Sequence, residues 1–268
     1  MIKLVVTDLD GTMLNRDSRV SKASREAIKK AREKGIKIAV ATGRPYRGTL
    51  HILRQSGLID DDNLSIYNTG ASIQKNSSGE KVLSNELTLE DMKELKYYTR
   101  GHNVNIVGYA SQAIYCEDDI YYKGLIWDSK SLRMPMYSTI EKGQLFERIN
   151  IMGDEDKIME VFSKIPDSFK DRFYIIKHET FSIEFLNKKA GKANALIKLC
   201  EYLDVDLNSE VLVLGDGKND IEMLSVAKNS VAMGNAIDEV KAICKYQTLR
   251  NDEEGFALAL ERFCELHK

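Results

Sequence analysis

The chain has 268 residues, of which 43% are hydrophobic and 30% are charged, a composition typical of a folded globular protein. This length is enough for one large domain or two modest ones, each with a buried core. Lysine and arginine number 39 against 41 aspartate and glutamate residues, so the formal net charge is −2. A charge so near zero gives no electrostatic reason to expect binding to nucleic acid or to an anionic membrane.

The apolar segments and the cysteines point to a cytoplasmic protein. No apolar stretch approaches the ~18 residues that a membrane span requires. The N-terminal apolar run, residues 2–6, is too short for the core of a signal peptide, and Asp8 and Asp10 interrupt it. The four cysteines are widely spaced, so we expect buried thiols rather than a disulfide framework or a zinc site.

The N-terminal part of the chain alternates between short apolar runs and helical patterns. An apolar run at residues 2–7 is followed by a helical pattern at 21–33, which Gly35 ends. A second apolar run, 36–41, leads into another helical pattern that extends to about residue 55. This order of strand, loop and helix predicts βαβ units and a parallel sheet.

The same pattern resumes near the C-terminus. The sequence predicts a helix at 191–203, strands at 211–214 and 230–233, and a final helix at 252–266. We therefore expect residues 1–82 and 187–268 to form one α/β core domain with a Rossmann-like parallel sheet.

The middle of the chain has a different character. Helices are predicted near 89–99 and 154–165, and paired strands at 104–107 with 113–116 and at 173–177 with 182–185. We therefore expect residues 83–186 to form a separate α+β cap domain inserted into the α/β core.

Three of the apolar runs end in polar loops, at residues 8–12, 42–44 and 215–220. In an open parallel sheet, ligands bind beyond the carboxyl ends of the strands, so these loops would meet in one crevice. That crevice would contain the carboxylates of Asp8, Asp10 and Asp216, the hydroxyl of Thr42 and several glycine amides.

Such a group of side chains suits a phosphoryl group held beside a cation. Clustered carboxylates repel one another unless a cation lies among them, and an all-oxygen site suits Mg²⁺. A hydroxyl and backbone amides near that cation can bind a phosphoryl group. Lys192, at the start of a predicted helix, would add a fixed positive charge and the helix dipole.

The segments Asp8-Leu9-Asp10-Gly11-Thr12, Ala41-Thr42-Gly43-Arg44, Lys192 and Gly215-Asp216-Gly217-Lys218-Asn219-Asp220 resemble the four motifs of the haloacid dehalogenase-like superfamily. The segment Gly217-Lys218-Asn219-Asp220-Ile221-Glu222-Met223-Leu224 and the long insertion between the second and third motifs are similar to its Cof-type hydrolase branch. The likeness extends over nearly the whole chain. One departure is that the family's usual Lys-Gly is Lys192-Ala193 here, with Gly191 before the lysine.

The resemblance implies that Asp8 is the nucleophile and forms an aspartyl-phosphate, while Asp10 acts as general acid and then as general base. We expect Asp8 to keep an ordinary low pKa and to be anionic at pH 7. Asp10 lies two residues further on, so an extended backbone would project it from the same side as Asp8.

The resemblance also implies the groups that bind phosphate and metal. Phosphate would be bound by Thr42, Lys192, Asn219 and the amides of Leu9 and Gly43. Mg²⁺ would be bound by Asp8, the carbonyl of Asp10, Asp216, and Asp220 in or just behind the first shell. Arg44 and Arg47 are candidates for contacts with the substrate phosphate or sugar, and Tyr121, Tyr122, Trp127 and Arg133 are candidates in the cap.

The function that the resemblance implies is that of a Mg²⁺-dependent phosphatase acting on small phosphorylated metabolites such as sugar phosphates. Two alternatives stay open: a phosphomutase or phosphotransferase with the same motifs, and a non-catalytic metabolite-binding module. No nucleic acid or membrane partner is expected, and the sequence makes no prediction of the oligomeric state.

Overall fold

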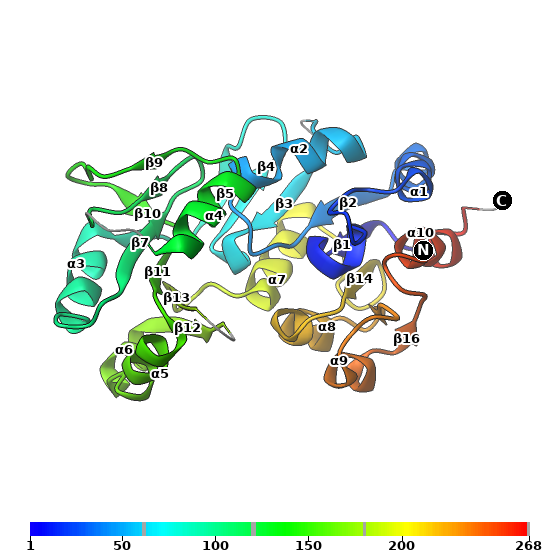
Figure 1. The fold of residues 1–268 in the computed structure, drawn as a ribbon. Helices are drawn as coiled ribbons and strands as arrows, with labels where there is room; N and C mark the ends of the chain where they lie inside the picture. The colour runs from blue at the N-terminus through cyan, green and yellow to red at the C-terminus, as the bar shows by residue number, and fades with distance from the viewer. Residues whose placement is uncertain (61–62, 119–121, 179–180, 267–268) are drawn as a thin grey trace. The chain divides into compact units, whose positions relative to one another are not determined.

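The computed structural model describes residues 1–60, 63–118, 122–178 and 181–266, and these form two compact units. The core unit consists of Met1–Gly43, Leu50–Val82 and Gly191–Lys268. The inserted unit consists of Leu83–Ala190 together with the short segment Arg44–Thr49. Figure 1 shows the chain coloured from its N-terminus to its C-terminus.

The core unit is built on a five-stranded parallel sheet in the order β16-β15-β14-β1-β2. The central strand β1 pairs with β14 on one side and with β2 on the other, so that Leu4 lies opposite both Val211 and Lys37. Every residue of β1 and β14 is buried, as expected for parallel strands covered on both faces. The α/β fold class predicted from the sequence is confirmed. The strands are β1 (Leu4–Thr7), β2 (Lys37–Val40), β14 (Val211–Gly215), β15 (Ser230–Ala232) and β16 (Tyr246–Gln247).

A second sheet of the core unit was not predicted from the sequence. It has the order β3-β4-β5, and a parallel bridge between Ala41 and Ile66 joins β3 to the end of β2. Its buried faces carry polar side chains such as Ser65 and Gln74, which break the apolar alternation that identifies a strand. The strands are β3 (Leu64–Tyr67), β4 (Ser72–Lys75) and β5 (Lys81–Ser84).

Helices cover both faces of the parallel sheet, with α1 packed against α10 on one side and α7 packed against α8 on the other (Figure 1). The start of α1 is fixed by Ser21, whose side chain accepts a hydrogen bond from the backbone N–H of Ser24 at 3.0 Å. The helices are α1 (Lys22–Glu33), α2 (Tyr46–Ser56), α7 (Lys192–Leu203), α8 (Ile221–Val226), α9 (Asp238–Ile243) and α10 (Gly255–Phe263).

The inserted unit contains a six-stranded sheet in the order β12-β13-β11-β7-β8-β9. The predicted hairpin is confirmed, because β12 and β13 pair antiparallel with Phe173 opposite Asn187. The strands are β6 (Leu87–Thr88), β7 (Asn105–Tyr109), β8 (Ile114–Tyr115), β9 (Met136–Tyr137), β10 (Leu145–Phe146), β11 (Arg148–Met152), β12 (Phe173–Lys177) and β13 (Ser182–Asn187). The helices are α3 (Leu89–Tyr98), α4 (Lys123–Ser131), α5 (Glu155–Ser163) and α6 (Asp167–Arg172).

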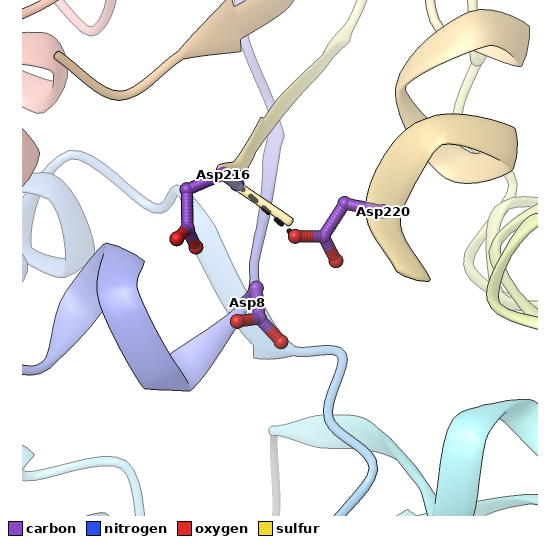
Figure 2. A group of neighbouring side chains, drawn as sticks. All are labelled: Asp8, Asp216 and Asp220. Atoms are coloured by element: carbon purple, nitrogen blue, oxygen red, sulfur yellow. Dashed lines mark hydrogen bonds between the residues drawn. The ribbon is translucent and has the colours of Figure 1, made fainter. Parts of the chain in front are cut away.

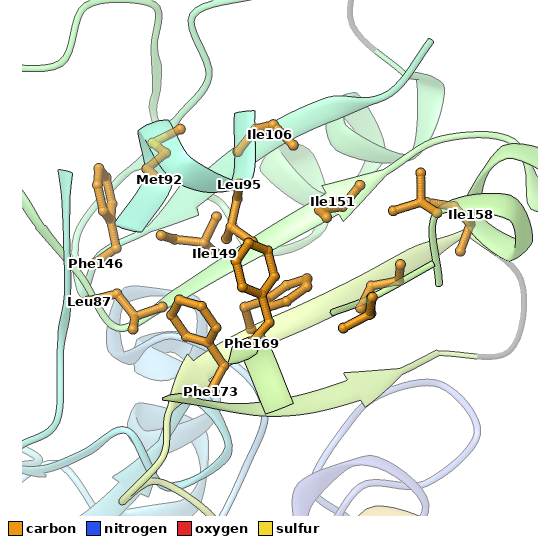
Figure 3. Packing of buried hydrophobic residues seen from close by; sticks show 14 residues of the cluster. Leu87, Met92, Leu95, Ile106, Phe146, Ile149, Ile151, Ile158, Phe169 and Phe173 are labelled. Atoms are coloured by element: carbon orange, nitrogen blue, oxygen red, sulfur yellow. The ribbon is translucent and has the colours of Figure 1, made fainter. Parts of the chain in front are cut away.

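The main hydrophobic core of the inserted unit lies between this sheet and helices α3, α5 and α6 (Figure 3). Phe185 is fully buried there, and its ring meets those of Phe169 and Phe173 edge to face, at 6.4 and 5.6 Å between centroids. The opposite face of the sheet carries a smaller cluster that includes Val107 and Leu125 of α4. The inserted unit therefore has a core of its own.

Replacing Phe185 by alanine tests how far this core holds the inserted unit together. Deleting a buried aromatic ring costs about 3–5 kcal/mol, so Phe185→Ala should lower the free energy of opening of β11 and β13 by that amount. Native-state hydrogen exchange measures this opening. Phe162→Ala, at a phenylalanine of the same unit that is 38% exposed, is the matched control. Equal losses in the two variants would contradict the described core.

Candidate active site

Asp8 lies directly after β1, at the carboxyl end of the central strand. Its side chain is buried, and its backbone N–H donates to the carbonyl of Leu214 on the neighbouring strand β14 at 3.1 Å. The chain then turns through residues Leu9–Met13. Gly11 has a φ of +82°, and a Cβ at this position would lie 2.2 Å from Oδ2 of Asp216. Only glycine therefore allows this turn to pass so close to that carboxylate.

Asp10 has a different environment from Asp8. Asp8 and Asp10 both have extended dihedral angles, with φ and ψ of −66° and 163° at Asp8 and of −78° and 118° at Asp10, although the turn Leu9–Met13 begins between them. The predicted extended backbone is therefore found at both aspartates but is interrupted at Leu9. Asp10 is exposed, whereas Asp8 is buried. Of the two carboxylates, only Asp10 is therefore in open contact with water.

Asp216 and Asp220 come from the loop that follows β14 (Figure 2). Oδ2 of Asp220 accepts hydrogen bonds from the backbone N–H groups of Asp216 and Gly217, both at 3.1 Å. Asp220 is fully buried, and its side chain thus holds the loop that carries Asp216. Asp216 itself accepts a hydrogen bond at Oδ1 from the hydroxyl of Thr12 at 2.8 Å.

The buried ammonium group of Lys192 joins two of these carboxylates. Lys192 is 1% exposed, and its Nζ lies 2.6 Å from Oδ1 of Asp8 and 2.7 Å from Oδ1 of Asp220. Burial alone would lower the pKa of Lys192, but the charges of Asp220 and Asp8 outweigh it and raise that pKa. The lysine is therefore a permanent cation inside the protein.

The carboxylates have raised pKa values, contrary to the ordinary low value expected for Asp8. Burial first, and then the charge of Asp220, raise the pKa of Asp8 to about 8, while Lys192 acts in the opposite direction. Burial raises the pKa of Asp216 to about 6, and the Thr12 hydroxyl partly offsets it. Further positive charge in this cluster would favour the anionic forms of both carboxylates.

The cluster suits a hard divalent cation. Asp8, Asp216 and Asp220 each offer an oxygen atom, and these three atoms lie within 4.8 Å of one another. Three carboxylates beside the single ammonium of Lys192 leave an excess of negative charge, which a divalent cation would neutralise. Oxygen-only donors of this kind are those that Mg²⁺ prefers.

Thr42 follows β2 and is held by a turn that sequence reasoning missed. Its N–H donates to the carbonyl of Ile66, and its carbonyl accepts from the N–H of Thr69, both at 3.0 Å. Asn68, Thr69 and Gly70 all have positive φ angles, of 45°, 54° and 88°. Left-handed backbone at non-glycine residues costs energy and tends to occur at functional sites. Asn68 and Gly70 are residue types that favour left-handed backbone, but the β-branched Thr69 is not, so the sequence signal for this turn is incomplete.

The same turn brings Lys192 into the site. The N–H of Gly191 donates to the carbonyl of Thr69 at 3.0 Å, and a Cβ on Gly70 would lie 2.2 Å from the carbonyl oxygen of Gly191. Gly191 has a φ of +115°, which favours glycine. A glycine before Lys192, rather than after it, is therefore what this close packing needs.

The other predicted site residues differ in their burial. Leu9 is buried and Gly43 is half-buried in the core unit. Asn219 is exposed, and its Oδ1 lies next to the Cα of Gly217. Arg44 belongs to the segment that groups with the inserted unit.

Among the cap candidates, Tyr121 lies outside the described residues. Tyr122 is half-buried with its ring 6.3 Å from that of Phe181, which indicates a packing role. Trp127 is 65% exposed. Arg133 is exposed, and its carbonyl accepts a hydrogen bond from Nε of Arg47 at 3.4 Å.

A polar cluster inside the inserted unit was also missed by sequence reasoning. Arg148 pairs with the buried Glu184 at 3.3 Å, and its guanidinium lies 4.1 Å from the ring centroid of Tyr109. Glu184 also contacts Nε2 of His178 at 2.9 Å. Oδ1 of the buried Asn150 has no hydrogen-bond partner among the residues that the structure describes. The cluster lies partly on β11, a strand that was not predicted.

Comparison with known proteins identifies the family. The family model of the haloacid dehalogenase-like hydrolases matches residues 5–260. The chain belongs to this family. Protein M6_Spy0533 of Streptococcus pyogenes is 32% identical over 265 residues, which cover 98% of both chains. The 5-amino-6-(5-phospho-D-ribitylamino)uracil phosphatase YitU of Bacillus subtilis is 29% identical over 283 residues, again 98% of both chains.

A solved structure of a haloacid dehalogenase-like hydrolase has a similar fold. The fold is similar to that of a haloacid dehalogenase-like hydrolase from Bacteroides thetaiotaomicron, with a TM-score of 0.88 and 29% identity. That match covers 98% of this chain and 99% of the other.

In the described part of this family member, no helix combines the length and the apolar character needed to cross a bilayer.

The role of Lys192 as a charge-balancing cation predicts a pH-dependent loss of stability in Lys192→Met. Removing the ammonium leaves buried carboxylates uncompensated, which typically costs about 3–5 kcal/mol. At pH 5, protonation neutralises Asp8 and Asp216, because their pKa values are raised to about 8 and about 6. The loss of stability should therefore be larger at pH 8 than at pH 5. Urea unfolding at the two pH values measures it.

Lys198→Met is the matched control, since Lys198 lies on the same helix with a side chain that is 57% exposed. A Lys192→Met variant that loses no more stability than this control at pH 8 would contradict the charge balance.

Proposed function

We propose that this hydrolase is a Mg²⁺-dependent phosphatase that acts on small phosphorylated metabolites through an aspartyl-phosphate on Asp8. The observation that carries the proposal is the contact of the buried Lys192 ammonium with Asp8 and Asp220, beside Asp216. A buried carboxylate fixed next to cations can approach an anionic phosphate monoester, which an isolated carboxylate would repel.

In the first step, a carboxylate oxygen of Asp8 attacks the phosphorus atom. Lys192 contacts Oδ1 of Asp8, so Oδ2 is the atom that we assign to the attack. The new bond joins Oδ2 to phosphorus, and the bond between phosphorus and the alcohol oxygen breaks. Asp10 gives its proton to that oxygen, and the alcohol leaves.

In the second step, water attacks the phosphorus atom of the aspartyl-phosphate. Asp10, now a carboxylate, takes a proton from this water while the bond between phosphorus and Oδ2 of Asp8 breaks. Inorganic phosphate leaves, and both aspartates return to their starting forms. The exposure of Asp10 supports this role, because a residue that exchanges protons with water must be reached by it.

The phosphate oxygens would be held by groups that surround Asp8. We assign the Thr42 hydroxyl, the amides of Leu9 and Gly43, and the side chains of Lys192 and Asn219 to this task. Thr42 is supported by its rigid placement between β3 and the turn at residues 68–70. Phosphoryl transfer depends mainly on position and charge neutralisation, so these groups are sufficient.

Asp8, Asp216 and the carbonyl of Asp10 are the groups that we assign to hold Mg²⁺. When bound, the ion would neutralise phosphate charge next to Asp8. We propose that Asp220 does not bind the ion directly but supports the residues that do. Its Oδ1 contacts Lys192, and its Oδ2 accepts hydrogen bonds from two backbone N–H groups.

The inserted unit would act as a cap that selects the substrate, while residues 1–82 and 187–268 carry out the chemistry. The polar cluster of Arg148, Glu184 and Asn150 supports this division. Oδ1 of Asn150 has no partner in the described part of the chain, and such a buried acceptor is costly unless a ligand uses it. The name of the relative YitU specifies a phosphate ester of a sugar-alcohol side chain. We therefore propose a sugar phosphate or a similar metabolite as the substrate, which implies a cytoplasmic enzyme.

Asp8→Asn tests the nucleophile. Phosphate release from 4-nitrophenyl phosphate and from a panel of sugar phosphates with Mg²⁺ should fall by about 10⁴-fold or more, because the covalent route is lost. The variant should still fold, because removing one of the crowded carboxylates leaves Lys192 paired with Asp220. A chelator should abolish the activity of the unaltered protein.

Asp17→Asn, at an exposed aspartate of the same N-terminal segment, is the matched control and should be fully active. Intact phosphate release in Asp8→Asn would overturn the nucleophile assignment. Accumulation of a phosphate isomer in place of inorganic phosphate would show a phosphomutase instead.

A further inference from the structure

We propose that Asn235 is a positioning residue that fixes the Asp216 carboxylate relative to the carbonyl of Gly11 and thereby sets the affinity of the site for Mg²⁺. The inference rests on the proposed function only in taking Asp216 as a ligand of that ion. Asn235 belongs to none of the four motifs, and it lies in the loop between β15 and α9.

The loop that carries Asn235 is fastened to the loop that carries Asp216. Before Asn235, the N–H of Met233 donates to the carbonyl of Gly215 at 3.1 Å. After it, the N–H of Ile237 donates to the carbonyl of Asp216, also at 3.1 Å. With backbone hydrogen bonds on both sides, Asn235 has little freedom to move away from Asp216.

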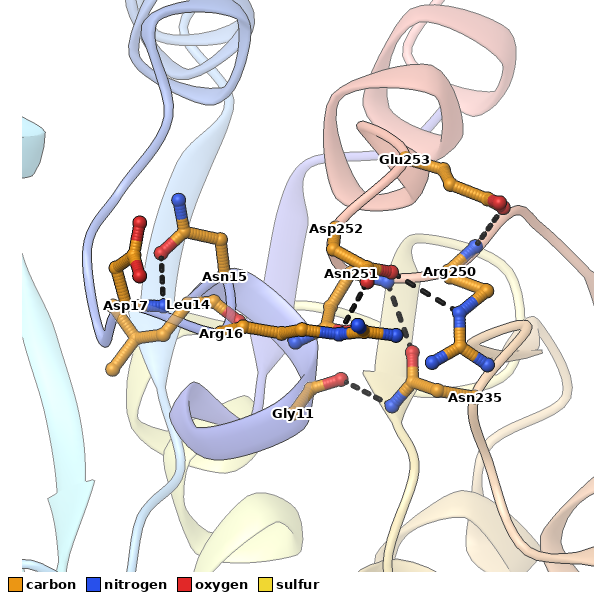
Figure 4. A network of polar contacts seen from close by, with 10 residues as sticks. All are labelled: Gly11, Leu14, Asn15, Arg16, Asp17, Asn235, Arg250, Asn251, Asp252 and Glu253. Atoms are coloured by element: carbon orange, nitrogen blue, oxygen red, sulfur yellow. Dashed lines mark hydrogen bonds and ion pairs between the residues drawn. The ribbon is translucent and has the colours of Figure 1, made fainter.

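The side-chain NH₂ group of Asn235 then bridges two parts of the site. Nδ2 donates to the carbonyl of Gly11 at 2.8 Å (Figure 4). It also donates to Oδ2 of Asp216 at 3.2 Å. Oδ1 of the same carboxylate accepts from the Thr12 hydroxyl at 2.8 Å. Both oxygens of Asp216 are thus tethered, which fixes the rotation of the carboxylate and the lone pairs left for a cation.

The other end of the Asn235 amide fixes its orientation. Oδ1 of Asn235 accepts the backbone N–H of Asn251 at 2.9 Å, so the NH₂ group must face the two acceptors at Gly11 and Asp216. Asn251 in turn donates from Nδ2 to the carbonyl of Leu14 at 2.8 Å. The segment before α10 therefore holds both Asn235 and the end of the turn that contains Asp10 (Figure 4).

Few other side chains could replace this asparagine. The position needs one acceptor and two donors at fixed angles, which a planar carboxamide supplies at this length. Aspartate would keep the acceptor but would lose both donors and place a further negative charge beside Asp216. Alanine removes all three hydrogen bonds, and among the residues that the structure describes Asp216 then keeps only the Thr12 hydroxyl as a side-chain tether.

The network offers a variant that separates positioning from simple structural support. Asn251→Ala removes the hydrogen bond to Leu14 but keeps the backbone N–H that Asn235 accepts. It is the same substitution in the same network, and Asn251 has no described contact with Asp216. Both variants should lower the thermal stability, but only Asn235→Ala should change how Asp216 is held.

Titration calorimetry of Mg²⁺ into the substrate-free full chain tests the proposal without reference to turnover. In Asn235→Ala, the dissociation constant should rise about 10- to 100-fold, the usual effect of losing a residue that orients a metal ligand. In Asn251→Ala, it should stay within about twofold of the value for the unaltered protein. Circular dichroism confirms that each variant is folded.

If Asn235→Ala does not fold, Asn235→Ser replaces it, because a hydroxyl fills part of the space but cannot reach both acceptors. The same rise in the dissociation constant is then expected. Unchanged affinity in the folded Asn235 variant, equal losses in the Asn235 and Asn251 variants, or no Mg²⁺ binding by the unaltered protein would each overturn the proposal. Mg²⁺ binding with the predicted losses but without phosphatase activity would refute the proposed function alone.

Discussion

The ion pairs of Lys192 with Asp8 and Asp220 are the interactions on which the site depends. Buried charges are stable only when they are paired and hydrogen-bonded, and here each carboxylate meets the ammonium at hydrogen-bond distance. The fold provides this contact by bringing together residues far apart in the chain. Strand β1 carries Asp8, and the loop after β14 carries Asp220. Helix α7 delivers Lys192 because Gly70 and Gly191 allow their backbones to pack without a Cβ between them.

A second constraint is the order of strands in the parallel sheet. Because β14 lies directly beside β1, the loops at their carboxyl ends are neighbours, and Asp216 comes within reach of Thr12 and the backbone of Gly11. Burial, and then the charge of neighbouring carboxylates that Lys192 does not fully balance, raise the pKa values of Asp8 and Asp216. A divalent cation would bring the charge close to balance and favour the anionic form of the proposed nucleophile.

Much of the core could be predicted from the sequence, because continuous apolar runs that end in polar loops identify buried parallel strands. The carboxylates at 8, 216 and 220 do lie together, since loops at the same edge of such a sheet must converge. Other features had no local signal. The left-handed backbone at the β-branched Thr69 goes against its local preference, and the pKa of Asp8 depends on burial that no motif reveals. The hydrogen bonds of Asn235 involve partners distant in the chain, so spacing alone could not find them.

Direct detection of the phosphoryl group on Asp8 is the measurement that tests the account most sharply. In Asp10→Asn, 4-nitrophenyl phosphate can still phosphorylate the enzyme, since nitrophenolate leaves without a proton, but the water that would release phosphate is not activated. Acid quenching after mixing with Mg²⁺ and substrate, followed by peptide mass spectrometry, should locate one phosphoryl group on Asp8. Nitrophenolate release without a phosphorylated peptide, or with the group on another residue, would contradict the proposed role of the Asp8–Lys192 pair.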